Sequence, residues 1–242
     1  MPGYLTRSRP EVRETVQELR RRGGLFSFRN DVPASEPVSS RNSISPELGV
    51  RAGAIVECLM ERHGAGAVTS AAQIMASSSD VRGFFVIVDH AREFYVPALS
   101  GWGIDPGQAL LLRPETREEA CWAIEECLRC PGVSATWAWV DKRMPARVHR
   151  RWQLAAEAGG GVGLFFRPAT ARREPVWADL RLLVTPQTGN QEETRRLKID
   201  VLYRRGGKGG TTQAWEIDHA AGLVRLVPEV AHSEVAMRKA RA

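Results

Sequence analysis

Short apolar runs alternate with stretches of helical pattern from residue 50 onward. Continuous apolar runs of strand length predict strands that are buried on both faces. We expect these strands at Gly53–Cys58, Phe84–Asp89, Ala109–Leu112, Ala135–Asp141 and Gly163–Phe166. We expect helices between them at Val68–Ala76, Phe94–Trp102, Arg117–Arg129 and Ala146–Ala158. This alternation predicts an α/β fold with a mostly parallel sheet flanked by helices.

The ends of two predicted helices carry recognisable signals. Thr116 is suited to the N-cap of the helix at Arg117–Arg129, and Glu118 and Glu119 favour its first turn. The glycines of Gly159–Gly161 end the helix that begins at Ala146.

After residue 175 apolar and polar positions alternate more strictly, which is typical of strands with one solvated face. The alternating segments are Trp177–Thr185, Arg196–Tyr203 and Thr212–Ile217, with a glycine-rich turn at Arg204–Gly210. We expect an antiparallel β-meander that extends one side of the sheet.

The two ends of the chain have a different pattern. Val12, Val16 and Leu19 form one apolar stripe on a charged helix at Glu11–Arg22. A Ser- and Pro-rich linker follows. We therefore divide the chain into an N-terminal helical segment (1–30), a linker (31–49), the α/β domain (50–228) and a charged tail (229–242).

The composition limits the classes of function. The chain has 242 residues and a formal net charge of +6, which suits contact with nucleic acid or an acidic partner, or simply a solvated basic surface. No apolar run reaches the ~18 residues of a membrane span, and the N-terminus lacks the apolar core of a secretion signal. We expect a cytoplasmic protein without membrane contact, in which the four cysteines need no disulfide.

The turn at Met60–Ala67 stands where nucleotide-binding domains carry a phosphate-binding loop. That loop reads G-x-x-x-x-G-K-[ST]; its N–H groups and Lys hold the phosphates and its hydroxyl binds Mg²⁺. Here the turn offers Arg62, His63, Gly64 and Gly66 but neither the lysine nor the hydroxyl. We expect no cofactor and no ATPase activity, and at most a weak attraction of an anion to the N–H groups.

Two predicted strands end in an aspartate. Asp141 has the place of the acid that holds Mg²⁺ beside a phosphate loop; without the loop hydroxyl it lacks a partner, and we interpret it as vestigial. Asp89, which precedes His90 and Glu93, has the chemistry to orient an attacking water or to cap the next turn. We favour the cap.

The remaining motifs give no catalytic or metal site. Cys127 and Cys130 form a C-x-x-C at the end of a predicted helix, whereas redox pairs use the helix N-terminus. The five histidines are scattered, so no second pair of zinc ligands follows. We expect buried, inert thiols and no metal.

Basic residues gather at three places. Such clusters can neutralise phosphates, although stacking aromatics are not interleaved with them, and a solvated helix face is the alternative. The candidates for nucleic-acid contact are Arg143, Arg147, Arg150, Arg172, Arg173, Arg204, Arg205 and Lys208.

The order of these elements resembles the RecA-like core. Gly53–Glu57 resembles the strand before its phosphate loop, and Ala135–Asp141 resembles its Walker-B strand. Ala178–Val184 and Leu197–Tyr203 resemble its later antiparallel strands.

Within that superfamily the chain more closely resembles ImuA, the RecA-like accessory protein of a bacterial translesion-synthesis mutasome. Gly53–Ala67, Trp102–Arg113 and Arg150–Pro168 carry the resemblance, and the last is the most specific. It covers roughly residues 45–205.

This resemblance implies a non-catalytic organiser that the SOS response to DNA damage induces. Its partners would be an ImuB-like inactive Y-family polymerase and an error-prone replicative-type polymerase, with RecA and DNA as further candidates. It would lie in the bacterial cytoplasm and join the nucleoid after damage. The position of the RecA catalytic glutamate corresponds to Ala91, with Glu93 close by, and Arg167–Glu174 replaces a long DNA-contacting loop.

Two alternatives remain open. A SulA-like division inhibitor, which is also a RecA-like relative without the phosphate loop, would bind the tubulin-like division protein. A residual ATPase or DNA recombinase would need an unorthodox loop. The sequence leaves the oligomeric state and the partner surface open.

Overall fold

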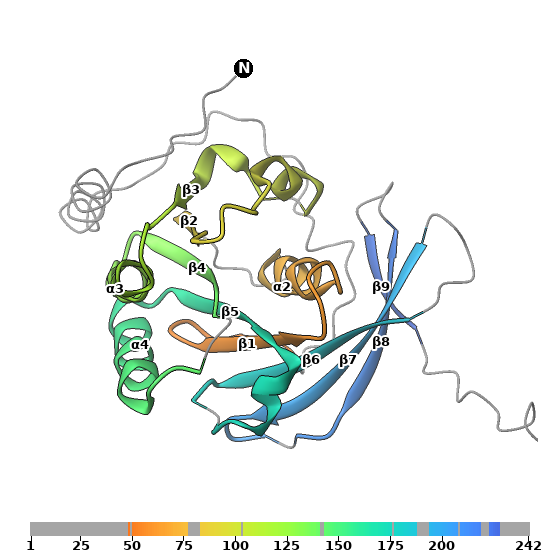
Figure 1. Ribbon diagram of the computed structural model, residues 1–242. Helices are drawn as coiled ribbons and strands as arrows, with labels where there is room; N and C mark the ends of the chain where they lie inside the picture. Colours follow the sequence, from red (N-terminus) through yellow and green to blue (C-terminus); the bar gives the residue numbers. More distant parts are fainter. Residues whose placement is uncertain are drawn as a thin grey trace, which may run out of the picture.

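The described residues form one mixed sheet of nine strands in the order β3-β2-β4-β5-β1-β6-β7-β8-β9 (Figure 1). The computed structural model describes residues 48, 50–76, 83–102, 104–140, 143–175, 177–187, 194–207, 209–218 and 223–227. The predicted N-terminal helix, the charged tail and all of the predicted linker except Leu48 lie outside these residues.

The neighbouring strands from β3 to β6 run parallel to one another, and β7, β8 and β9 continue the sheet, each antiparallel to the strand before it. All six residues of β1 are buried, as a parallel strand covered on both faces requires. The strands are β1 (Ile55–Met60), β2 (Phe84–Val88), β3 (Ala109–Leu112), β4 (Val133–Trp139), β5 (Val162–Pro168), β6 (Leu180–Gln187), β7 (Thr194–Arg204), β8 (Thr212–Asp218) and β9 (Leu223–Val227).

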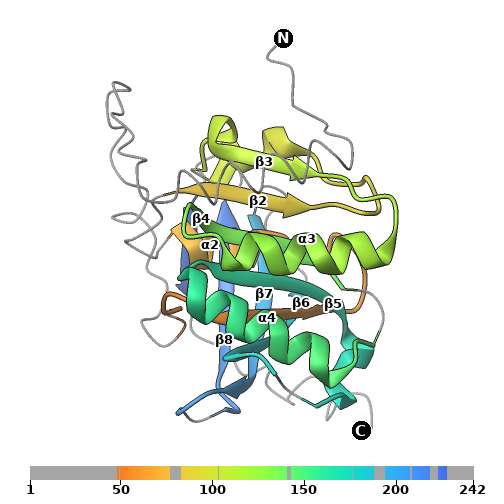
Figure 2. The ribbon, with the colours of Figure 1, turned by 90° about the vertical axis from the view of Figure 1, so that its left-hand side faces the viewer.

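Helices cover both faces of the parallel part. Helices α3 (Arg117–Arg129) and α4 (Ala146–Gly159) lie side by side on one face, in front of β4 and β5 in Figure 2. Helix α2 (Ala67–Ala76) and the 3-10 segment η3 (Val96–Trp102) lie on the other face. The short 3-10 segments η4 (Pro106–Gln108) and η5 (Ala169–Arg173) complete the described elements.

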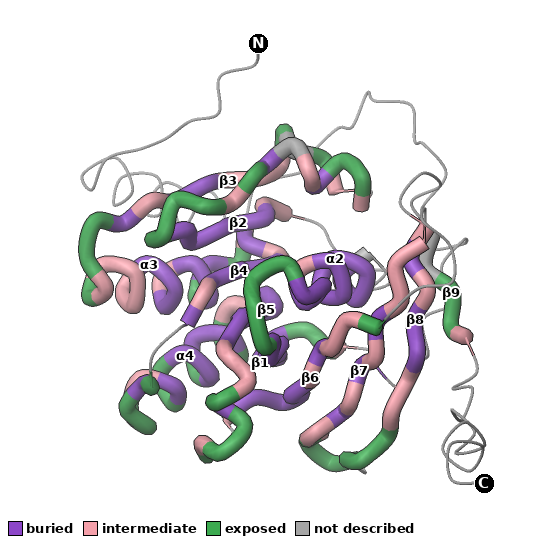
Figure 3. The backbone as a smooth tube through the Cα atoms, turned by 45° about the vertical axis from the view of Figure 1, so that its right-hand side comes forward, coloured by how far each residue is buried: buried purple, intermediate pink, exposed green. Residues whose placement is uncertain are grey.

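Helix α2 lies in the hollow between the parallel strands and the curved antiparallel wing (Figure 3). It is rich in Ala, Ile and Met, and its polar residues Thr69, Ser70 and Gln73 are buried as well. Leu197 and Trp215 of the wing join the same hydrophobic cluster as Ala71 and Met75 of α2. A second cluster lies under α3 and α4. The wing is therefore part of the core and not an appendage.

The predicted helix ends are confirmed for α3 and α4. The hydroxyl oxygen of Thr116 accepts a hydrogen bond from the backbone N–H of Glu119 at 3.2 Å. Gly160 takes a left-handed conformation with φ 81° and ends α4. The predicted bounds of α3 and β3 are also those of the structure.

Four predictions need correction. The segment Phe94–Trp102 is not an α-helix, because only Val96–Trp102 is helical and it is 3-10. The first strand begins at Ile55, since Gly53 has a left-handed φ of 72° and belongs to a turn. Strand β4 spans Val133–Trp139 and not Ala135–Asp141, whereas β6 pairs antiparallel with β7 as the predicted meander requires and joins β1 in parallel. Strand β9 was not predicted.

Thr136 in β4 is fully buried, and its hydroxyl meets no hydrogen-bond partner among the described residues. Thr136→Val is expected to raise the free energy of unfolding by about 1 kcal/mol, because the unsatisfied hydroxyl carries a desolvation penalty. Urea titration measures the change. In the control variant Ser70→Ala, a buried hydroxyl that donates to the carbonyl oxygen of Gly66 at 3.0 Å is lost, and stability should fall. Equal destabilisation of both variants would refute this expectation.

Candidate functional site

The turn that joins β1 to α2 stands where a phosphate-binding loop would lie but lacks the side chains of that loop. Gly64 and Gly66 both take a positive φ, 76° and 99°. Helix α2 begins immediately after Gly66, so Ala67 stands where the motif has its lysine, and Val68 stands where it has Ser or Thr. Ala67 is buried. Neither side chain can neutralise a phosphate or bind a metal ion.

Strand β7 holds this turn in place. A Cβ on Gly66 would lie 2.6 and 2.7 Å from the methyl carbons of Leu197, so the leucine side chain takes the space beside the turn. The Arg195 guanidinium donates a hydrogen bond to the carbonyl oxygen of Gly64. The antiparallel wing thus fixes the turn by packing and by hydrogen bonding.

A cavity of about 380 Å³ opens beside the turn, at the carboxyl ends of β1, β2, β4 and β5. Open α/β sheets bind ligands at such edges. Its apolar lining includes Met60, Trp139 and Phe166, and the rings of Trp139 and Phe166 lie 4.9 Å apart. Arg62 and His63, both exposed, stand at its rim. Charged and aromatic groups therefore share the lining, which also includes Glu61, Asp89 and Arg167.

Asp89 at the end of β2 is buried and serves the local backbone. Its two carboxylate oxygens accept hydrogen bonds from the N–H groups of Glu93 at 3.0 Å and Phe94 at 3.1 Å. Arg113 Nε lies 3.7 Å from the same carboxylate. These contacts support the interpretation of Asp89 as a cap of the turn that follows β2.

Ala91 and Glu93 both line the cavity at the position expected for the RecA glutamate. The Glu93 carboxylate lies 3.7 Å from His63 Nδ1, and both side chains are largely exposed. Asp141, the predicted Walker-B-like acid, lies outside the described residues. Within the described ranges no three His, Cys, Asp or Glu side chains gather as metal ligands.

The predicted nucleic-acid residues fall into separate groups. Arg143 and Arg147 line a second cavity, between α3 and α4, whereas Arg150 donates to the side-chain oxygen of Gln153. Arg172 and Arg173 are exposed in η5. Lys208 is not described.

Arg204 and Arg205 lie beside the start of β6, at the amino ends of the parallel strands, whereas the first cavity lies at their carboxyl ends. The Arg205 guanidinium lies 3.2 Å from Asp179, which also accepts from the backbone N–H of Ile55 at the start of β1. Burial opposes ionisation of Asp179, but the Ile55 N–H and the guanidiniums of Arg205 and Arg51 outweigh it and lower its pKa. The arginines at the two ends of the strands therefore cannot contact one short stretch of nucleic-acid backbone. Arg205 is also already paired with Asp179.

The C-x-x-C pair lies where the sequence placed it, at the carboxyl end of α3. Cys127 and Cys130 are buried, and burial raises the pKa of the Cys127 thiol. Burial also raises the pKa of Cys58 to about 12. The thiols of Cys58 and Cys127 are therefore held in the protonated form, and the prediction that the C-x-x-C cysteines are buried is confirmed.

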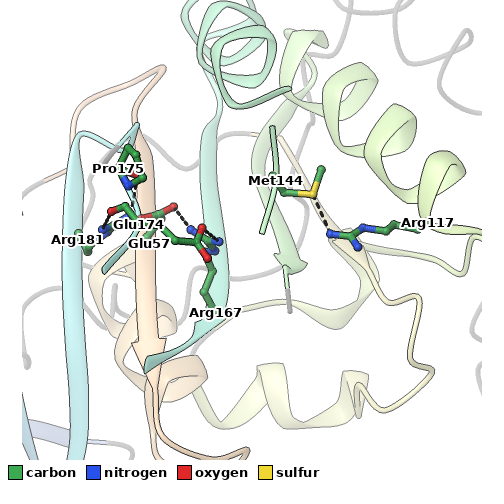
Figure 4. Close-up of polar contacts among 7 residues, drawn as sticks. All are labelled: Glu57, Arg117, Met144, Arg167, Glu174, Pro175 and Arg181. Atoms are coloured by element: carbon green, nitrogen blue, oxygen red, sulfur yellow. Dashed lines mark hydrogen bonds and ion pairs between the residues drawn. The ribbon is translucent and has the colours of Figure 1, made fainter. Parts of the chain in front are cut away.

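A buried charge cluster, which was not predicted from the sequence, joins the three adjacent strands β5, β1 and β6 (Figure 4). The Glu57 carboxylate lies 3.1 Å from an Arg167 nitrogen and 2.6 Å from Arg181 Nε. Arg167 also pairs with Glu174 at 2.7 Å, and Arg181 donates to the carbonyl oxygens of Glu174 and Pro175. The available signal was a charged residue inside each of three apolar runs, since such residues are rarely buried unless paired.

A comparison with solved structures finds the flagellar accessory protein FlaH from Methanocaldococcus jannaschii, with a TM-score of 0.54 and 7% identity. The match covers 74% of this chain and 92% of FlaH. The fold is RecA-like. At this identity the likeness concerns the fold alone. Comparisons with protein-family models and with curated proteins find no match.

This RecA-like fold places the β1–α2 turn at the edge of the sheet that receives ligands in related architectures. The turn, Asp89 and the aromatic cavity all lie at that edge, and each departs from a phosphate-binding arrangement. None of the helices in the described ranges has both the length and the apolar character of a membrane span.

Proposed function

We propose that this protein is a non-catalytic RecA-like adaptor in SOS-induced translesion DNA synthesis. It would bridge an ImuB-like inactive polymerase and an error-prone replicative-type polymerase in the bacterial cytoplasm, at the nucleoid after damage. The resemblance of Gly53–Ala67, Trp102–Arg113 and Arg150–Pro168 to ImuA supports the pathway. The observation that carries the non-catalytic part is the turn itself, in which Ala67 and Val68 replace the lysine and the hydroxyl.

The chemistry at the carboxyl ends of the parallel strands favours binding over catalysis. Phosphoryl transfer depends on positive charge and a metal ion around the transferred phosphate. The basic side chains that line the described part of the site are Arg62, His63, His90 and Arg167. Arg167 is already paired with Glu57 and Glu174, and Glu93 lies beside His63. The aromatic lining of the cavity suits an apolar group better than a polyphosphate.

ATP with Mg²⁺ is expected to leave the melting temperature unchanged, because a ligand stabilises only a state that it binds. Differential scanning fluorimetry at about 1 mM nucleotide tests this, with an active RecA-like ATPase as the positive control. A clear rise that requires Mg²⁺ would contradict the proposal and favour a residual ATPase or recombinase.

Affinity capture of the tagged protein from cells with damaged DNA, followed by mass spectrometry of the captured proteins, tests which partners it binds. Recovery of the two polymerases supports the adaptor. Recovery of the tubulin-like division protein instead favours the SulA-like inhibitor. RecA or DNA in the captured material would extend the set of partners, and nuclease treatment distinguishes direct contact from bridging by DNA.

A further inference from the structure

The second cavity, of about 540 Å³, lies between α3 and the start of α4, on the face opposite α2. Apolar groups line its floor, among them Trp122, Val148 and Trp152. Arg117, at the first position of α3, and Arg147, in the first turn of α4, stand on its two sides. A volume in this range can enclose one or two large side chains.

The arginines of this cavity differ in how far they are already engaged. Arg151 lies 2.5 Å from Glu125, which also holds Arg129, so its charge is balanced inside the protein. Within the described ranges Arg117 and Arg147 make no ion pair. Arg117 donates to the sulfur of Met144 at 3.1 Å, a weak acceptor for a guanidinium (Figure 4).

Arg143 also lines the cavity, is exposed, and pairs with no carboxylate of the described residues. It lies just before α4, whose N-cap residue Pro145 makes no side-chain cap and whose first turn contains no acid. Arg143 and Arg147 thus stand near the positive end of the helix dipole, an unfavourable arrangement for cations. A bound carboxylate would relieve this repulsion while it paired with the arginines.

We propose that this arginine-rimmed cavity binds an acidic segment of a partner protein, in which carboxylates flank a large apolar side chain. The apolar side chain would enter between α3 and α4, and the carboxylates would pair with Arg117, Arg143 and Arg147. Buried aromatic residues with arginines are typical of the energetic centre of protein–protein interfaces. This inference rests on one part of the proposed function, namely that the partner of this chain is a protein.

The apolar lining and the shape of the cavity favour a peptide over nucleic acid. Trp122, Val148 and Trp152 offer apolar surface to a side chain of the partner. The cavity is a local hollow between two helices, whereas sequence-independent nucleic-acid binding uses a continuous basic groove that follows the backbone.

The test is fluorescence anisotropy with the full chain and a labelled peptide of sequence Glu-Asp-Asp-Leu-Phe-Asp-Glu-Glu. We expect saturable binding that weakens about tenfold or more in the double variant Arg117→Ala/Arg147→Ala. The matched control, Arg172→Ala/Arg173→Ala, removes the same charge from exposed positions in η5 and should leave affinity unchanged. Replacing Leu-Phe of the peptide by Ser-Ser should also abolish binding. Circular dichroism and melting temperatures establish that both variants fold.

Three outcomes would overturn the inference. They are no peptide binding, equal losses in both double variants, and stronger Arg117- and Arg147-dependent binding of a single-stranded oligonucleotide of about 20 nucleotides. The experiments distinguish failure of the proposed function from failure of the proposed peptide site. If the peptide binds but the polymerases are not captured, the peptide site is supported and the adaptor function is not. If the polymerases are captured equally well by Arg117→Ala/Arg147→Ala, the adaptor function is supported and this site is not needed for it.

Discussion

Replacing Glu57 by alanine is expected to lower the free energy of unfolding by about 3–5 kcal/mol, the largest effect of any single change considered. The Glu57 carboxylate is 1% exposed and is the shared partner of Arg167 and Arg181, which are 1% and 2% exposed. Its removal leaves two guanidiniums in the interior without their common counter-ion. Because domains are stable by only about 5–15 kcal/mol, the variant should lie close to unfolding. Urea titration followed by circular dichroism measures the loss.

The control for this prediction replaces the whole cluster. The triple variant Glu57→Leu/Arg167→Met/Arg181→Met is expected to match the wild-type stability or exceed it, since buried ion pairs seldom outperform well-packed apolar residues. Glu174→Ala, which removes a partly exposed acid from the edge of the cluster, should cost less than Glu57→Ala. A loss of under about 1 kcal/mol for Glu57→Ala would show that the arginines find other partners or water.

Gly159→Ala is the second large effect, with an expected loss of about 3 kcal/mol. A Cβ at this position would lie 2.1 Å from the carbonyl oxygen of Leu128 and 2.8 Å from the carbonyl carbon of Arg129. Both atoms belong to the backbone of α3, so no side chain can rotate away. The ends of α3 and α4 would have to separate, which would open the second hydrophobic cluster. Urea titration again provides the measurement.

The neighbouring glycine supplies a matched control. Gly160 has a left-handed φ of 81°, but a Cβ there meets nothing within 4 Å. Gly160→Ala should therefore cost only the conformational strain, about 1–2 kcal/mol. If both variants lose the same stability, the close approach of the two helices is not the reason for the glycine at position 159.

The RecA-like fold follows from local patterns that the tertiary structure leaves intact. Apolar runs on both sides of Thr116–Arg129 fix the strands, and the capping threonine fixes the start of α3. The degenerate phosphate turn is equally visible, because the lysine and hydroxyl are absent from the chain itself. Such features depend on residues within a few positions of one another, and sequence reasoning handles these best.

Other elements depended on contacts between distant residues. The segment after Asp89 has a helical pattern, yet its first residues form a turn whose Glu93 and Phe94 N–H groups donate to the Asp89 carboxylate, and the helical part is the 3-10 segment Val96–Trp102. Strand β6 has the alternation of a meander, but its place beside β1 makes that pair parallel. The periodicity of one segment contains no information about the direction of its neighbour.

The features of the candidate sites also fall into two groups, those visible in the sequence and those that depend on the tertiary structure. The sequence by itself determined the strand–helix order, the absence of the phosphate-binding side chains and the place of the C-x-x-C at a helix end. Only the tertiary structure joined Glu57 to Arg167 and Arg181, brought Arg117 and Arg147 to one cavity, and separated Arg204 and Arg205 from the other candidate arginines. The physical reason is that charge pairs and cavities form between side chains that are distant in the sequence. Glu57 is more than a hundred positions from each of its arginines, and Arg117 and Arg147 are some tens of positions apart. The order of the strands decides which of these residues meet.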